Sequence, residues 1–154
     1  MPPPASITVD VDKPGAKISP TLWGIYFEDI NLSADGGIYP ELVRNRSFED
    51  SNKPAHWQLI NQTDGQGEMT IDTRTPLNPY NRSSLRVRLD GAASVANEGY
   101  WGMSIVEGET YKLRLAARCA NGFQGPLHAV IERADGSDLA KGTIEGVGDR
   151  WQWF

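Results

Sequence analysis

The chain has 154 residues, a formal net charge of −5, 39% hydrophobic residues, 16 glycines and 10 prolines. Its acidic balance excludes a basic surface for nucleic acid and a polybasic membrane patch, and no apolar run is long enough to span a bilayer. The many turn-forming residues and short alternating runs favour a mainly β protein whose length suffices for a stable core.

Residues 1–17 are predicted to contain one short strand. Ile7, Val9 and Val11 alternate with polar residues, which is typical of a half-buried strand, and the sequence DKPG at residues 12–15 ends it. The start, MPPPAS, lacks the basic and apolar regions of a signal peptide. The redox compartment stays open because Cys119 is the one cysteine of the chain.

Residues 18–50 are predicted to form a β-loop-α unit. The sequence LWGIYF at residues 22–27 is typical of a strand buried on both faces, and Glu28 and Asp29 follow directly. A charge at the carboxyl end of a buried strand suits a barrel of alternating strands and helices. The turn at residues 35–37, DGG, then leads to IYPELV, where a proline in the first helical turn and a following glutamate are favourable.

Residues 51–154 are predicted to contain strands only, arranged as a β-sandwich or jelly roll. Each run is bounded by Gly, Pro, Asn or Asp, and residues 106–109, VEGE, suit a tight hairpin turn. The predicted strands are residues 57–61, 68–73, 84–89, 100–106, 110–119, 127–133, 140–145 and from 150 onward.

Three stretches closely resemble the N-terminal signature of glycoside hydrolase family 51, the longer α-L-arabinofuranosidases: ISPTLWGIYFEDIN, DGGIYPELVRNRSFE and NEGYWGM. The resemblance spans almost the whole chain, and residues 50–84 match in character more than in motif. It implies that residues 1–17 join a C-terminal sandwich absent here. Residues 18–50 would begin an incomplete (β/α)8 barrel, and residues 51–154 would be an inserted sandwich similar to carbohydrate-binding modules, cut at its end.

The resemblance implies that Glu28 hydrogen-bonds hydroxyls of the arabinofuranosyl ring in the subsite for the nonreducing sugar. A structural carboxylate is the alternative. Retaining hydrolysis needs two carboxyl groups roughly 5 Å apart across the sugar. Glu28 and Asp29 are not expected to form this pair, because neighbours in an extended strand point to opposite faces.

The pair Asn97-Glu98 has the order of the acid/base motif implied by the resemblance, but it lies among predicted strands without strand-helix alternation. We therefore interpret Glu98 as an exposed loop carboxylate. The catalytic glutamates are expected beyond Phe154, so no catalytic residue is assigned in this chain, and the chain alone is predicted to be inactive.

The aromatic residues provide a second set of candidate sugar contacts, because aromatic faces suit the C–H faces of sugar rings. Tyr80, on a turn-rich loop, and Trp101, beside Tyr100, are the two candidates. The other four tryptophans are assigned to buried positions: Trp23, Trp57, Trp151 and Trp153.

No cofactor is predicted. The two histidines, His56 and His128, lack partners at zinc-ligand spacing, and no phosphate-binding glycine loop is present. A structural calcium ion is possible at the acidic turn DGSD, residues 135–138, although such sequences usually form only turns. Cys119 is interpreted as a buried strand thiol.

Two functions remain open. The chain is part of a retaining α-L-arabinofuranosidase that removes arabinofuranosyl side chains from arabinoxylan or arabinan, or residues from about 51 onward form an autonomous carbohydrate-binding module. A sandwich that only braces the barrel is a third possibility. The expected partners are arabinose-containing glycans and the remaining segments of the parent enzyme, for which an extracellular or periplasmic location is favoured.

Overall fold

The computed structural model describes residues 5–61, 65–120, 122–123 and 125–154. Within these ranges the chain forms eight β-strands and no helix, so the mainly β prediction is confirmed. No helix of the described residues is long and apolar enough to cross a membrane. The strands are β1 (Trp57–Asn61), β2 (Gln66–Asp72), β3 (Ser84–Asp90), β4 (Ala93–Asn97), β5 (Ala116–Ala117), β6 (Leu127–Glu132), β7 (Asp138–Ile144) and β8 (Gln152–Trp153).

The strands pair two by two, and every pair is antiparallel. β2 pairs with β3 and β6 with β7, so both pairs join strands consecutive in the chain. β1 pairs with β4 and β5 with β8, which brings distant parts of the sequence together. In the described part of the chain these pairs do not merge into the two continuous sheets of a jelly roll.

Side-chain alternation explains which face of each strand is covered. In β3, Leu85 and Val87 are half-buried while Arg86 and Arg88 are exposed, as the period-two pattern predicts. β6 alternates in the same way. Covering is incomplete, because none of the described apolar side chains is fully buried.

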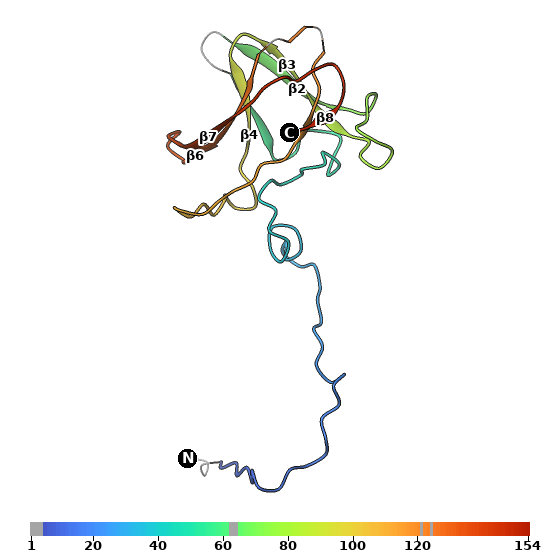
Figure 1. Ribbon diagram of the computed structural model, residues 1–154, viewed down its shortest axis with the longest axis vertical. Coiled ribbons are helices and arrows are strands. Elements are labelled where there is room, and N and C mark those ends of the chain that lie inside the picture. The colour runs from blue at the N-terminus through green and yellow to red at the C-terminus, as the bar shows by residue number, and fades with distance from the viewer. Residues whose placement is uncertain (1–4, 62–64, 121, 124) are drawn as a thin grey trace.

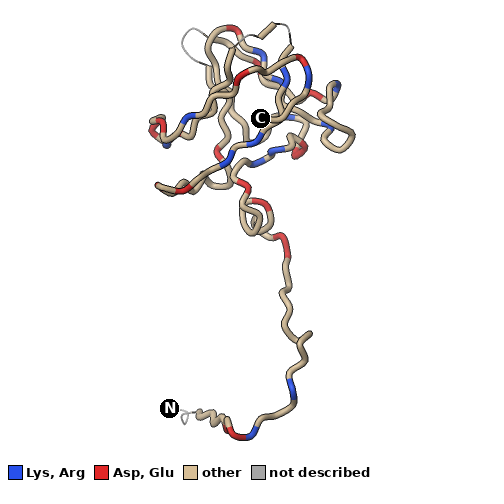
Figure 2. Tube along the Cα trace, viewed as in Figure 1, with Lys and Arg blue, Asp and Glu red and all other residues tan. Residues whose placement is uncertain are grey.

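Residues 5–27 form an extended arm that runs away from the strands, and the turns of residues 28–40 connect it to the rest of the chain (Figure 1). We call residues 57–154 the β-body and residues 41–56 the junction segment. Apolar side chains of the arm face solvent: Ile25 is 94% exposed and Trp23 77% exposed. Lys and Arg are spread among Asp and Glu over both arm and β-body (Figure 2).

The predicted β-loop-α unit is not formed. Residues 22–27 are extended but pair with no other described strand, and residues 38–43 form a bridge and turns instead of a helix. A strand needs a neighbour for its ladder, and a short helix needs packing against an apolar face to be stable. The described chain supplies neither to these two segments.

Of the eight strands predicted in the β-body, six are present, one is absent and one is much shorter than predicted, and one observed strand was not predicted. Residues 100–106 are not a strand, because Trp101 and Gly102 adopt left-handed backbone angles, with φ of +76° and +94°. Residues 110–119 contain only the short β5, and β4 was not predicted. The turn at residues 106–109 is present, with the Glu109 N–H donating to the Val106 carbonyl at 3.2 Å.

Asn45 holds the junction segment to the start of β1. Its side chain is 5% exposed, donates to the Ala55 carbonyl at 2.9 Å and accepts from the Asp50 N–H at 3.3 Å. Its own carbonyl accepts a hydrogen bond from the Trp57 indole at 3.3 Å. These bonds satisfy the hydrogen-bonding groups of a buried amide.

The exposed arm predicts selective proteolysis. Trypsin should cut after Lys17, in the arm, well before it cuts after Arg88, whose backbone is paired with β2. Mass spectrometry of a time course would identify the first products. Equal resistance at the two sites would show that the arm is as ordered as the β-body.

Asp72 gives a prediction about pH. Its pKa is lowered because Thr75 Oγ1 donates to one carboxylate oxygen at 2.5 Å and the Arg74 N–H donates to the other at 2.9 Å. Because the pKa of Asp72 is lower in the folded state, its ionised carboxylate stabilises the folded state at pH values above the unfolded-state pKa of about 3.9. This stabilisation is lost as the pH falls through the folded-state pKa.

Asp72→Asn imitates the protonated carboxyl, so it should lower the free energy of unfolding at pH 7 by up to about 1 kcal/mol. The effect is small because solvent screens this carboxylate. The difference from the unmodified protein should vanish near pH 2. Thermal unfolding at both pH values would measure it, with Asp90→Asn as the charge control. A difference that is the same at both pH values would contradict the assignment.

Candidate functional site

Glu28 begins a run of turns, residues 28–39, which we call the Glu28 loop. Ser33 Oγ donates to the Glu28 carbonyl at 3.0 Å, and the Ala34 N–H donates to Asp29 Oδ1 at 3.0 Å. Asp29 is therefore engaged in the turn. The Glu28 residue is exposed, and within the described structure its carboxylate forms no hydrogen bond or ion pair.

Charged side chains tie the end of this loop to the junction segment. Arg46 forms an ion pair with Asp35 at 2.6 Å and lies 3.7 Å from the Glu41 carboxylate. The hydrogen bond to Asp35 raises the pKa of Arg46. The guanidinium also lies over the Tyr39 ring, 5.5 Å from its centroid. These charged groups are partly exposed to solvent, which weakens their ion pairs, so they orient the loop more than they stabilise it.

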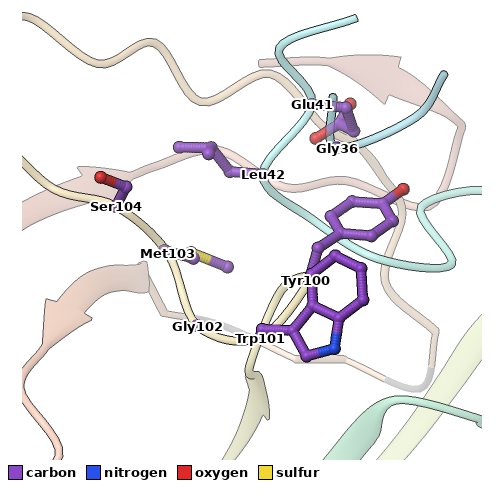
Figure 3. Close-up of a pocket in the computed structure, with 8 residues that line it drawn as sticks. All are labelled: Gly36, Glu41, Leu42, Tyr100, Trp101, Gly102, Met103 and Ser104. Carbon is purple, nitrogen blue, oxygen red and sulfur yellow. The ribbon is translucent and has the colours of Figure 1, made fainter. Parts of the chain in front are cut away.

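A pocket of about 340 Å³ lies where the loop meets the β-body (Figure 3). Its size falls at the lower end of the range for small-molecule sites. Figure 3 shows Tyr100, Trp101 and Met103 among the side chains that line the pocket. The lining residues are Gly36, Glu41, Leu42, Tyr100, Trp101, Gly102, Met103 and Ser104.

Trp101 and Tyr80 are both exposed aromatic residues. Trp101 is 78% exposed at a left-handed φ of +76°, a conformation that costs energy for a residue with a Cβ. Tyr80 is 90% exposed on a loop held by Asn78, whose Oδ1 accepts from the Tyr80 N–H at 2.8 Å. The two side chains lie on separate loops and do not line one pocket.

The other tryptophans divide into two groups. Trp57 and Trp151 are half-buried, and their indole N–H groups donate to the carbonyls of Asn45 and Thr75. Trp23 and Trp153 are exposed, so the prediction of burial is wrong for them. Trp23 lies in the uncovered arm, and the Arg114 guanidinium lies 4.6 Å from the Trp153 ring.

Asn97 uses its whole side-chain amide to connect the end of β4 to the junction segment. Nδ2 donates to the carbonyls of Arg44 at 2.9 Å and His56 at 3.0 Å. Oδ1 accepts from the N–H groups of Arg44 at 3.1 Å and Gly99 at 3.0 Å. Glu98 is exposed beside it. Nothing in the sequence marks Asn97 for this role.

The described residues contain no group of three His, Cys, Asp or Glu side chains that could hold a metal ion. At the acidic turn, Asp135 Oδ1 accepts from both the N–H and the hydroxyl of Ser137. Cys119 is half-buried outside any strand, and its thiol donates to the Val147 carbonyl at 3.1 Å, so its placement in a strand was wrong.

Asn97→Asp should destabilise the protein by about 1 to 3 kcal/mol, because an oxygen would replace Nδ2 opposite two carbonyl oxygens. Asn61→Asp introduces the same charge at an exposed position of β1 and serves as the control. Denaturant unfolding would measure both changes. Equal stability of the two variants would contradict the role of Asn97.

Comparisons with known proteins give a consistent family. The chain is 42% identical over 150 residues to an extracellular exo-α-L-arabinofuranosidase from Streptomyces chartreusis, covering 95% of this chain and 18% of that protein. It is 35% identical over 170 residues to α-L-arabinofuranosidase 1 from Arabidopsis thaliana, and the match covers 99% of this chain and 24% of that protein. A probable α-L-arabinofuranosidase A from Aspergillus terreus is 36% identical over 105 residues, and the match covers 65% of this chain and 16% of that protein.

No protein-family profile and no solved structure matches the chain. The chain spans 16–24% of the length of the three relatives described. The alignments with the bacterial and plant proteins cover 95% and 99% of this chain, so they span both the Glu28 loop and the β-body. This chain is therefore homologous to a portion of the α-L-arabinofuranosidases.

Proposed function

We propose that this chain acts as part of a retaining α-L-arabinofuranosidase that removes arabinofuranosyl side chains from arabinoxylan or arabinan. The homology to such enzymes over 95% of the chain is the observation that carries this proposal. In it, Glu28 contributes to the sugar subsite, and the β-body is an accessory domain. The general acid/base and the nucleophile come from other segments of the parent enzyme.

The environment of Glu28 supports sugar binding. Ionised carboxylate oxygens only accept hydrogen bonds, which suits the hydroxyl groups of a sugar. Asp29 already accepts the Ala34 N–H, whereas the exposed Glu28 carboxylate has no partner among the described side chains. Of the two adjacent acids, Glu28 is thus the one available to a ligand.

The arm supports the proposed domain organisation. Residues 18–50 expose a strand-like apolar run, LWGIYF, that would be covered if neighbouring barrel strands packed beside it. In the parent enzyme this segment would form the first β-α unit, residues 1–17 would pair with a distant sandwich, and residues 51–154 would form the inserted sandwich.

An autonomous carbohydrate-binding module is the second candidate. Trp101 favours it, because its backbone holds a strained left-handed angle while the ring remains 78% exposed. A flat, exposed indole is a suitable surface for the C–H face of a sugar, and Tyr80 provides a further exposed ring.

The first test separates subsite from module. Isothermal titration of this chain with arabinoxylan, arabinan and xylo-oligosaccharides should detect no saturable binding, and the chain should not hydrolyse an aryl arabinofuranoside. In the parent enzyme, Glu28→Gln should lower kcat/KM about 10- to 100-fold, the loss expected for a hydrogen bond to a charged group. Glu98→Gln is the control and should leave it unchanged.

Turnover by this chain alone would contradict the assignment of the catalytic carboxylates to other segments. Polysaccharide binding that persists in Glu28→Gln but is lost in Trp101→Ala would instead establish the β-body as a binding module. Unchanged kcat/KM for Glu28→Gln in the parent enzyme would remove Glu28 from the subsite.

A further inference from the structure

The Tyr100 ring packs directly on the backbone of the Glu28 loop. A Cβ placed on Gly36 would lie 2.5 Å from Cγ of the ring and 2.7 Å from Cδ2, closer than real Cβ contacts allow. Gly36 also has a left-handed φ of +82°. Glycine at this position therefore allows both the turn and the close approach of the ring.

Neighbouring residues reinforce the same contact. A Cβ on Gly99 would lie 2.8 Å from the Leu42 carbonyl oxygen, so this backbone is also closely packed. The Arg44 guanidinium lies 5.9 Å from the Tyr100 centroid, within range of a cation–π interaction. Asn97 binds the backbone of Arg44 through two hydrogen bonds.

A short series of hydrogen bonds leads from Gly36 back to Glu28. The Gly36 N–H donates to the Tyr39 carbonyl at 3.2 Å, and the Tyr39 N–H donates to the Ala34 carbonyl at 2.9 Å. The Ala34 N–H donates to Asp29, and Ser33 Oγ donates to the Glu28 carbonyl. The position of Gly36 is thus coupled to the backbone at Glu28.

We propose that Tyr100 is a positioning residue, whose ring holds the Glu28 loop against the β-body so that the Glu28 carboxylate is ordered before sugar binds. The inference rests on the proposed function for the role of Glu28, but the packing of Tyr100 on the loop stands independently. An ordered loop loses less conformational freedom on binding, which raises affinity without a new contact to the ligand.

Backbone hydrogen exchange of this chain tests the packing. Tyr100→Leu should increase exchange at Ala34, Gly36 and Tyr39 about tenfold, because the loop loses its ring contact and opens more often. Tyr100→Phe should retain the protection, because the contact is made by the ring. Tyr80→Leu removes an exposed tyrosine and is the matched control. Equal exchange in Tyr100→Leu and the unmodified chain would overturn the proposal.

A double-mutant cycle guards against general loss of folding. Gly36→Ala and Gly136→Ala both place a Cβ at a φ of +82°, but Gly136 has no atom within 4 Å of that Cβ. Gly36→Ala should therefore loosen the loop more than Gly136→Ala loosens its own turn. The additional loosening of the loop by Gly36→Ala should be smaller when Gly36→Ala is combined with Tyr100→Leu, because Tyr100→Leu removes the clashing ring. Additive effects would contradict direct contact.

The parent enzyme separates this inference from the proposed function. Tyr100→Leu should raise KM for an aryl arabinofuranoside about tenfold with a smaller change in kcat, and Tyr100→Phe should restore KM. Faster hydrogen exchange in the Tyr100→Leu variant of this chain, with an unchanged KM in the parent enzyme, would overturn the positioning role. If Glu28→Gln also leaves the enzyme unchanged, the proposed subsite role of Glu28 fails while the packing contact remains.

Discussion

The side-chain amide of Asn97 is the interaction on which the rest of the arrangement depends. Its two donors and its acceptor oxygen bind backbone groups of Arg44 and His56 in the junction segment and of Gly99 in the β-body. An amide in this position satisfies carbonyl and N–H groups that no strand reaches. It thereby fixes the distance between the β-body and the segment that leads to the Glu28 loop.

The arm shows the opposite situation, since its apolar side chains are exposed, whereas several strand residues of the β-body, such as Leu85 and Val87, are half-buried. Large exposed apolar surfaces usually mark a contact with other protein. The homologous enzymes are four to six times longer than the matched portion, by the coverage of 16–24%, and so contain much additional protein. The exposed apolar arm and the greater length of the relatives are both consistent with the proposal that further segments of a parent enzyme cover the arm.

The local sequence pattern was sufficient to predict strands where strands that are neighbours in the sequence pair with each other. The strands β2, β3, β6 and β7 follow from alternation and from turn residues, because each pairs with a strand next to it in the sequence. Prediction failed where distant groups decide the conformation. The sequence YWGM suggested a strand, yet left-handed angles at Trp101 and Gly102 let Tyr100 meet Gly36. The contacts of Asn97, likewise, could not be read from its neighbours.

Nuclear Overhauser effects between the Tyr100 ring protons and the α-protons of Gly36 would test the account most directly, because the two groups are 64 residues apart in sequence, from 100 − 36, and meet only if the β-body holds the Glu28 loop. Strong effects are expected in this chain, with the Gly36 signals displaced by the ring current of Tyr100. A β-body with intact cross-strand effects between β2 and β3 but none from Tyr100 to Gly36 would contradict the packing of Tyr100 on the Glu28 loop.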